Sequence, residues 1–335
     1  MADTILLAHG SGGMLSQQLI EEHFLPFFSN PILGSLDDGG LFAINGMRLC
    51  MSTDTYVVDP LFFPGGDIGK LAICGTLNDV AMCGGAPLYL SVAVIIEEGF
   101  SLGDLDRVIA SMARTAKEAG ISVITGDTKV VPHGKGDKLF INSTGIGLVS
   151  YSGTISGTHA QPGDTIILSG TIGDHGMAVM SMREGLSFSG EIHSDVAFLH
   201  TLVKEILTAS AHIHCMRDPT RGGVASVLNE IAERSRKTFL LEEEAIPVKP
   251  SVRGACEILG IDPLYVANEG KMLVFVADED AQRVLETMRA HPLGREAAVI
   301  GRVVEDSAGE VVIRTAIGGT RMLDRPTGEI LPRIC

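Results

Sequence analysis

A segment rich in Gly, Ser and Thr, residues 152–164, divides this chain of 335 residues into two halves of similar length. Strand-like and helix-like stretches alternate on both sides of it, and each half is long enough to form a domain with its own core. Hairpin-like pieces are also present, so the pattern predicts a mixed α+β fold rather than a purely parallel sheet. We therefore predict domains at residues 1–153 and 154–321, followed by a flexible tail at 322–335.

The pattern of apolar residues gives the expected elements. Glycine and proline mark the turns between them, including one at residues 83–87. The predicted strands are 4–8, 48–52, 89–96, 122–125, 140–150, 165–169 and 271–277, and the predicted helices are 15–28, 67–82, 102–119, 178–184 and 195–209.

Composition limits the class of function. Hydrophobic residues make up 45% of the chain and charged residues 20%, as in a well-packed globular protein. The formal net charge of −15 argues against nucleic acid, which is bound by clustered Lys and Arg. It leaves room for a nucleotide, because Mg²⁺ held by carboxylates neutralises a triphosphate locally.

The sequence also predicts a cytoplasmic location. An acid, Asp3, stands where a signal peptide would need basic residues. The longest apolar runs, such as residues 90–96, are too short to span a membrane. The six cysteines have no regular spacing, which is typical of reduced cytosolic thiols.

Carboxylates recur at chain reversals in the first half. Three of the four acidic sites lie beside Gly, Ser or Thr, and Lys129 adds a cation suited to a phosphate near the last of them. Such a set of hard oxygen ligands fits Mg²⁺ and a triphosphate, whereas each acid alone reads more simply as a turn or N-cap residue. The candidate metal ligands are Asp37, Asp38, Asp54, Asp79 and Asp127.

A glycine-rich loop at residues 9–13 precedes the first predicted helix. Its candidate phosphate-binding residues are Gly10, Ser11, Gly12 and Gly13, whose backbone N–H groups could cradle an anion. The loop lacks the Gly-Lys-Ser/Thr ending of a Walker A motif, so a plain connection to the helix is an equal alternative.

The second half contributes polar residues between apolar elements. Glu269, beside Gly270, is a candidate general base, and Arg221 is a candidate phosphate or carboxylate clamp. The alternatives are an ion pair between Glu269 and Lys271 and an N-cap role for Asp218.

The last residue, Cys335, differs from the other cysteines. It ends a proline-containing tail, so we expect an exposed and mobile thiol. Its position excludes a prenylation box, in which the cysteine is fourth from the end. The alternative to a functional role is that Cys335 is an exposed thiol without a function.

These residues resemble the HypE family of hydrogenase maturation proteins, within the PurM-like superfamily related to aminoimidazole ribonucleotide (AIR) synthetase. The superfamily motifs specify fold and ATP use, while the Pro-Arg-Ile-Cys ending is specific to the HypE branch. The matching segments cover essentially the whole length: residues 9–13, 52–64, 70–79, 126–131, 218–223, 247–254, 267–271 and 332–335.

The resemblance implies a homodimer, with the strands of two N-terminal domains forming a barrel, and ATP between the two domains of the chain. It implies Mg²⁺ on Asp54, Asp79 and Asp127, with either Asp37 or Asp38 as a further ligand. ATP-binding residues implied by the matching segments include Lys70, Asn78, Asp79, Asp127 and Lys129.

The resemblance also implies a reaction on Cys335. A carbamoyl group would arrive from the carbamoyltransferase HypF, and ATP-dependent dehydration would convert the S-carboxamide to a thiocyanate. The cyano group would pass to iron on the HypC–HypD complex. Lys129 would offset developing charge, and Glu269, or else His9 or His175, would accept protons.

Two alternatives have other consequences. A selenophosphate synthetase or small-molecule kinase would share the fold, but the former would need a reactive cysteine near residues 9–13, where none occurs. A non-catalytic scaffold or metal carrier would need further Cys or His ligands near the tail, and after Arg321 only Cys335 is available.

Overall fold

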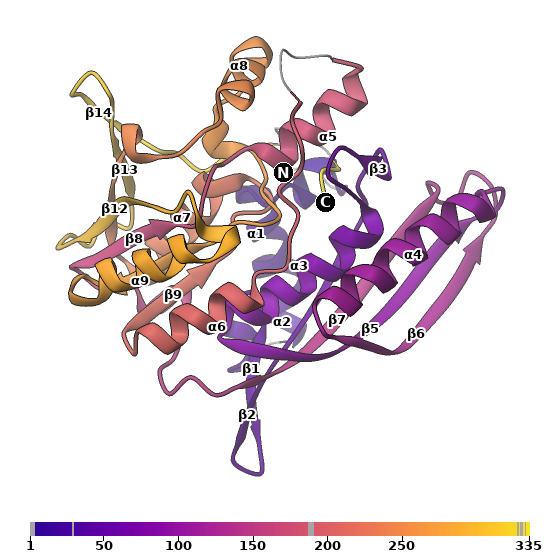
Figure 1. Ribbon diagram of the computed structural model, residues 1–335, viewed down its shortest axis with the longest axis horizontal. Coiled ribbons are helices and arrows are strands. Elements are labelled where there is room, and N and C mark those ends of the chain that lie inside the picture. Colours follow the sequence, from indigo (N-terminus) through magenta and orange to yellow (C-terminus); the bar gives the residue numbers. More distant parts are fainter. Residues whose placement is uncertain (1–3, 29, 187–190, 327, 329–330, 332) are drawn as a thin grey trace.

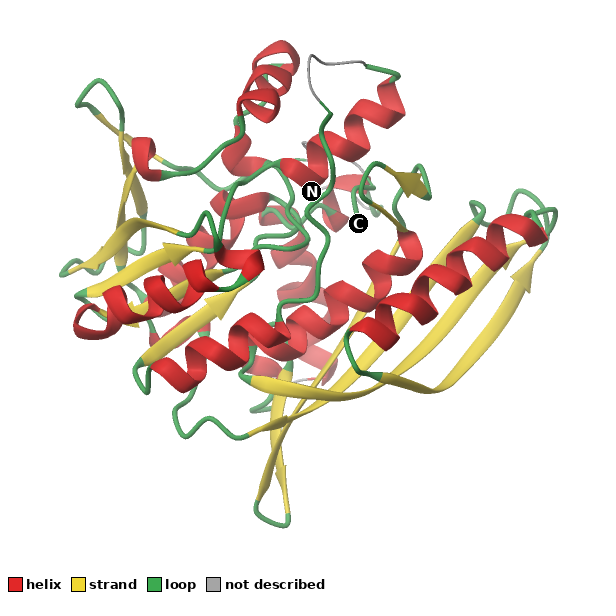
Figure 2. Cartoon of the chain, in the orientation of Figure 1, coloured by secondary structure: helices red, strands yellow, loops and turns green. Residues whose placement is uncertain are grey.

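The computed structural model describes residues 4–28, 30–186, 191–326, 328, 331 and 333–335. Two β-sheets, one from each half of the chain, carry the helices between and around them (Figures 1 and 2). This mixed α+β architecture confirms the predicted fold class. None of the helices in the described part combines the length and apolarity that a bilayer-spanning helix requires.

The first sheet has the strand order β1-β2-β7-β5-β6, with β5 and β6 parallel and the other neighbours antiparallel. Burial alternates along β7 residue by residue, because one face of this sheet packs on helices and the other does not. Its strands are β1 (Gly40–Ile44), β2 (Met47–Tyr56), β5 (Gly85–Glu97), β6 (Ser122–Val131) and β7 (Leu139–Val149).

Helices α3 (Ile68–Met82) and α4 (Leu102–Glu118) cover one face of the first sheet (Figure 1). Asp67 caps α3 by accepting hydrogen bonds from two amides of its first turn. Helix α3 is buried almost all round because it lies between the sheet and the second half of the chain, whereas α4 is amphipathic. A small ribbon, β3 (Phe62–Phe63) and β4 (Gly66–Asp67), precedes α3.

The second sheet has the order β14-β13-β10-β12-β8-β11-β9. Its strands are β8 (Asp164–Leu168), β9 (Ile213–Arg217), β10 (Thr238–Glu242), β11 (Leu273–Ala277), β12 (Ala298–Val304), β13 (Val311–Arg314) and β14 (Thr320–Met322). The helices of this half are α5 (Asp174–Glu184), α6 (His200–Ala209), α7 (Gly223–Ser235), α8 (Pro250–Leu259) and α9 (Asp278–Ala290).

The N-terminal segment differs from its prediction. Residues 4–8 were expected to form a strand, but a 3₁₀ turn, Leu7–Gly10, occupies this region. The predicted helix at 15–28 is present as α1 (Met14–Leu19), a π-helical turn (Ile20–Phe24) and α2 (Leu25–Phe28). Short 3₁₀ turns elsewhere are Leu33–Ser35, Gly157–His159, Glu243–Ala245, Pro263–Tyr265 and Pro292–Gly294.

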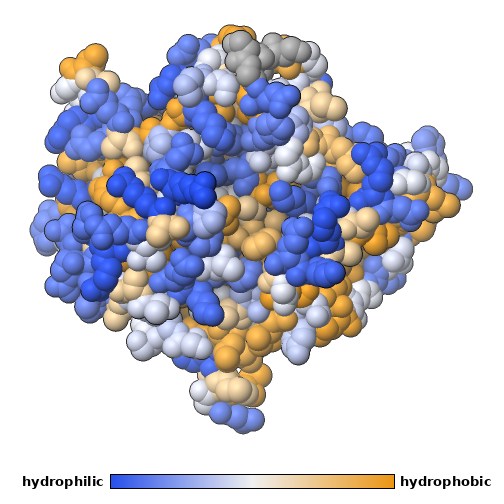
Figure 3. Space-filling view, in the orientation of Figure 1, coloured by the Kyte–Doolittle hydropathy of each residue, from blue (hydrophilic) through white to orange (hydrophobic). Residues whose placement is uncertain are grey.

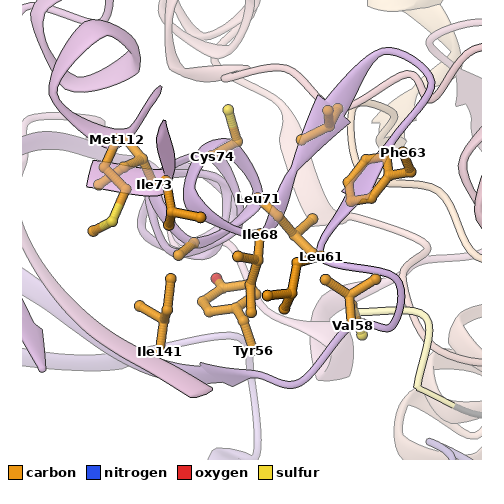
Figure 4. Packing of buried hydrophobic residues seen from close by; sticks show 14 of the residues in the cluster. Tyr56, Val58, Leu61, Phe63, Ile68, Leu71, Ile73, Cys74, Met112 and Ile141 are labelled. Carbon is orange, nitrogen blue, oxygen red and sulfur yellow. The ribbon is translucent and has the colours of Figure 1, made fainter. Parts of the chain in front are cut away.

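The core of the first half includes the end of the chain. Tyr56, Val58 and Leu71 pack in this cluster (Figure 4), and Ile334 and Cys335 belong to the same cluster. The residues closest to the C-terminus therefore return to the first half of the molecule, as the position of the C-terminus in Figure 1 shows.

Candidate functional site

Three carboxylates meet where the two halves of the chain join. Asp38 precedes β1, Asp79 lies near the end of α3, and Asp218 follows β9. Each offers an oxygen within 4.8 Å of the others, and they form the only group of this kind among the described residues. The sequence predicted two of these residues as metal ligands, and the structure adds Asp218.

The electrostatics of this acidic cluster favour a cation. Burial raises the pKa of Asp38 and Asp79 well above the usual range, and neighbouring carboxylates raise both further. Arg217 compensates Asp38 in part, with its Nε 2.7 Å from Asp38 Oδ1. Asp38 Oδ2 is buried and has no hydrogen-bond partner among the described residues. Three hard oxygen donors with an unused buried oxygen fit Mg²⁺.

Asp54 and Asp37 lie beside the acidic cluster and have different contacts. The charge of Asp54 raises the pKa of Asp79, Asp218 and Glu269, so Asp54 faces the same space. Asp37 instead accepts a hydrogen bond from Gly157 N–H at 2.9 Å and ties the junction between the halves to the first sheet. Of the adjacent pair at 37–38, the structure therefore brings Asp38 into the metal-binding group.

Asp127 and Lys129 lie away from the acidic cluster within one chain. They pair with each other at 2.7 Å on the edge strand β6, with both side chains largely exposed. Three strand spacings separate β6 from β2, about 14 Å. Within one chain, Asp127 and Lys129 therefore do not reach the acidic cluster, and their predicted role at the metal and phosphate site stays a prediction.

Asn78 and Lys70 also differ from their predicted roles. The Asn78 amide is buried and bonded to the main chain of the second half: it donates to Ala197 and Glu269 and accepts from Leu199 N–H. It holds the halves together and is not available to ATP. Lys70, on the first turn of α3, donates to the Gly65 carbonyl and does not line the cleft above the acidic cluster.

The glycine-rich loop lies at the mouth of this cleft but does not cradle an anion through its central amides. Ser11 N–H donates to Ala8 O, and Gly12 N–H donates to Ser16 Oγ. Gly12 has φ +75°, and a Cβ there would lie 2.9 Å from Arg221 Cβ. The loop is glycine-rich because it packs closely against the second half of the chain.

A cleft of about 880 Å³ opens above the acidic cluster. The glycine-rich loop, α1–α2, β1 and β2 line it, together with one side of α7 and the residues just before that helix. Its volume suits a nucleotide. Four arginines line it together with the carboxylates and give it positive charge: Arg217, Arg221, Arg234 and Arg325.

The tail enters the molecule from the other side of Arg221. Val57 N–H donates to the terminal Cys335 oxygen at 3.1 Å, and Asp59 N–H donates to Arg333 O at 3.2 Å. The Arg333 guanidinium pairs with Asp137. Cys335 is only 9% exposed, so the prediction of an exposed thiol is wrong. Main-chain hydrogen bonds to residues 57–59 compensate for the conformational entropy that is lost when the tail is ordered.

The Cys335 thiol faces Arg221 and Glu269. Burial raises its pKa well above the usual value, Arg221 lowers it, and Glu269 raises it. A small cavity of about 140 Å³ adjoins it, lined by Arg221, Ala267 and residues of the glycine-rich loop. The thiol is therefore protonated in this position and does not act as a nucleophile there.

Glu269 is a buried carboxyl whose Oε1 has no hydrogen-bond partner within the part of the chain that the structure describes. Burial raises its pKa well above the usual range, and the Asp218 and Asp195 charges add to this. The main chain around it is fixed: Asp195 accepts hydrogen bonds from Glu269 N–H at 3.1 Å and Gly270 N–H at 3.3 Å. Gly270 is required because a Cβ would lie 1.9 Å from the Asp195 carbonyl oxygen.

The predicted alternatives to Glu269 as a base are weaker. Both ring nitrogens of His175 lie within hydrogen-bond distance of other groups, and His9 Nδ1 accepts from Leu6 N–H. The predicted ion pair of Glu269 with Lys271 is absent from the described residues, since Lys271 Nζ bonds Asp195 at 3.1 Å. Sequence reasoning missed Asp195, for which no motif gave a signal.

Comparison with known proteins supports this description. The model of the AIR synthase related protein, N-terminal domain, matches residues 36–149, and that of the C-terminal domain matches residues 161–314. The fold and the acidic cluster between the domains thus define an AIR synthase related protein.

The chain is 54% identical over 332 residues to the carbamoyl dehydratase HypE of Azotobacter vinelandii, covering 99% of this chain and 97% of that one. It is 47% identical to HypE of Escherichia coli K12, covering 99% and 100%. A hydrogenase maturation protein HypE solved in complex with ATP has a TM-score of 0.84 at 50% identity, covering 99% and 100%. This chain belongs to the HypE family of carbamoyl dehydratases.

Proposed function

We propose that this protein carries a carbamoyl group on Cys335 and dehydrates it to a thiocyanate at the expense of ATP, supplying the cyano ligand of [NiFe]-hydrogenase. One observation carries the proposal: the terminal thiol is buried, and its pKa is influenced by the charges of Arg221, Glu269 and Asp218, the last of which belongs to the acidic cluster. A reaction on an attached group gains from this placement, because the group and the ATP site are held together.

The residues divide the chemistry between them. Transfer of a phosphoryl group to the carboxamide oxygen turns a poor leaving group into phosphate, and loss of phosphate and both N–H protons gives the S–C≡N group, with ADP as the other product. Glu269 accepts a proton, and its raised pKa makes it a stronger base. Asp38, Asp79 and Asp218 would hold Mg²⁺, which would offset the charge of the phosphates.

Carbamoylation of Cys335 is proposed to occur outside the cleft. The buried thiol is protonated and enclosed, so the tail must leave before it can react with a donor enzyme. A similar chain has been solved as a HypE–HypF complex, with a TM-score of 0.88 at 49% identity and coverage of 92% and 99%. We propose a HypF carbamoyltransferase as the donor and HypC–HypD as the acceptor, all in the cytoplasm.

Mass spectrometry of the C-terminal peptide tests this function. After incubation with HypF, carbamoyl phosphate and ATP, we expect a peptide carrying a carbamoyl group and then the same peptide lacking one water. The second species should require both ATP and Asp79, since Asp79 belongs to the acidic cluster. A carbamoylated peptide that never loses water, with the chain folded and ATP bound, would contradict the proposal.

The open face of the first sheet supports a homodimer. Residues on this face form apolar rows across the strands: Met51 pairs with Ile146, which pairs with Tyr89, and Ile95 pairs with Phe140. Met51, Tyr89 and Ile95 are between 44% and 49% exposed. Hydrophobic residues are visible at the lower right of the molecule in Figure 3, where the strands of this sheet reach the surface. An exposed apolar face of this kind marks an interaction surface.

A barrel built from two such sheets would also give Asp127 and Lys129 a role. The free edges are β1 and β6, so closure would bring β6 of one copy beside the β1–β2 edge of the other. That edge leads to Asp38 and carries Asp54. We therefore propose that Asp127 and Lys129 serve the ATP site of the second copy.

Replacing Ile95 by glutamate should convert the dimer to a monomer, because a charge would be buried in the interface. Sedimentation velocity measures the change. Ile317→Glu is the matched control, since Ile317 is 96% exposed at a turn of the second half and should leave the dimer intact.

Mixing two inactive variants tests the shared site. Random dimers of Asp79→Asn and Lys129→Ala chains should recover about a quarter of the wild-type rate, because half the dimers are mixed and each mixed dimer has one intact site. No recovery from demonstrated mixed dimers would show that each site uses its own Lys129, contrary to the proposal.

A further inference from the structure

His175, the second residue of α5, contacts the main chain of the tail. Its Nε2 lies 2.8 Å from the Ile334 carbonyl oxygen, and its Nδ1 lies 2.8 Å from Ser194 Oγ. The side chain is fully buried, and its ring packs edge-on against Phe63 with the centroids 5.3 Å apart.

The neighbouring hydrogen bonds define the protonation of this ring. A carbonyl oxygen only accepts, so Nε2 carries the hydrogen that it donates to Ile334. Ser194 Oγ accepts from Val196 N–H at 3.1 Å and has its own hydrogen available for Nδ1. Burial lowers the pKa of His175, which agrees with a neutral imidazole donating through Nε2.

The last three carbonyls of the tail find their hydrogen-bond donors in both halves of the chain. The Arg333 and Cys335 oxygens accept from the main-chain amides of Asp59 and Val57. The Ile334 oxygen faces the opposite way, into the second half of the chain, where the imidazole is its donor. Ile334 is 3% exposed, so loss of this donor would leave a buried carbonyl without a partner.

We propose that His175 is a positioning residue that fixes Ile334 and thereby holds the Cys335 sulfur against Glu269 and Arg221. The contact crosses from α5 of the second half to a tail that also pairs with residues 57–59 of the first. The contact therefore stabilises the inserted tail from the second half of the chain, while main-chain hydrogen bonds stabilise it from the first half.

The reason for such a contact rests on the proposed function: a carrier thiol must be held in the cleft for dehydration and released for carbamoylation. The equilibrium between the inserted and the released tail can be measured without that chemistry. A thiol that reacts only when released is alkylated at a rate proportional to the fraction of released tail.

The test is alkylation of the full-length protein by iodoacetamide, followed by mass spectrometry, with Cys335→Ala as the blank for the other five thiols. His175→Phe keeps an aromatic ring against Phe63 but cannot donate, and should speed alkylation of Cys335 about tenfold. His175→Gln places an amide N–H near the position of Nε2 and should stay within about twofold of wild type.

Unchanged melting temperature and unchanged alkylation of the other thiols show that the His175→Phe chain is folded. Equal Cys335 alkylation in the wild type and the Phe variant would overturn the proposal. Alkylation of the Gln variant as fast as that of the Phe variant would also overturn it, because the effect would then come from ring packing. Faster alkylation together with an unmodified tail in the carbamoylation assay would retain the positioning role and reject the proposed function.

Discussion

A chain with Cys335 replaced by alanine is expected to form no carbamoylated or dehydrated tail and to lose the ATP hydrolysis that depends on carbamoylation. The sulfur atom is the point of attachment, and no neighbouring side chain can replace it. The other five cysteines are buried thiols, and none belongs to the tail. Product analysis and phosphate release, each with HypF and carbamoyl phosphate present, measure the two losses.

Cys256→Ala is the matched control for this variant. Cys256 is also a buried thiol, but it packs in a separate apolar cluster of the second half. It should retain most of the activity while losing a comparable side chain. A Cys335→Ala chain that still gives a cyanide-equivalent product would exclude Cys335 as the carrier, whatever the behaviour of the control.

The second large effect is expected at Glu269. Glu269→Gln keeps the size of the side chain but cannot accept a proton, so dehydration of the carbamoylated tail should slow by about 10²–10⁴-fold. The variant should still be carbamoylated, because Glu269 is buried and the tail reacts outside the cleft. Single-turnover conversion of the carbamoylated peptide, followed by mass, separates the two steps.

The raised pKa of Glu269 also predicts how the rate of dehydration changes with pH. Because burial raises the pKa of Glu269, a larger part of the population is protonated at neutral pH than for an ordinary glutamate. Only the ionised form accepts a proton, so the wild-type rate should rise as the pH increases through that raised pKa. Glu269→Asp should keep this rise at a lower rate and Glu269→Gln should lose it; a Gln variant that keeps both rate and rise would place the base elsewhere.

Much of the fold was predictable because it depends on local pattern. Alternating burial along β7 and the apolar spacing of α3 and α4 follow from the periods of strand and helix, which the sequence displays directly. Residues 4–8 are the exception. They are mostly apolar, but they lie outside both sheets and lead into a 3₁₀ turn, Leu7–Gly10.

Some residues of the site were predictable from the sequence, but their arrangement in space was not. Asp38 and Asp79 were recognised because each lies beside Gly or Asn, as carboxylate ligands often do. Asp79, however, lies within helix α3 and not at the predicted chain reversal. Asp218, 139 positions after Asp79, could be placed beside it only by the packing of the two halves. The same packing explains why Asn78, which is adjacent to Asp79, forms hydrogen bonds with main-chain groups of the second half and not with a ligand.

The sequence by itself determined that the chain ends in a thiol on a tail and that carboxylates recur beside Gly, Ser, Thr or Asn, since both are properties of single positions and short spacings. It did not determine their place in the fold, because Asp54, Asp79 and Asp127 lie within β2, α3 and β6 and not at the predicted chain reversals. The tertiary structure decided where the thiol lies and which carboxylates meet. Strand order moved Asp127 and Lys129 to a free edge, and pairing with residues 57–59 drew Cys335 into the core. Contacts between residues far apart in sequence depend on how sheets and halves pack, and no local pattern contains that information.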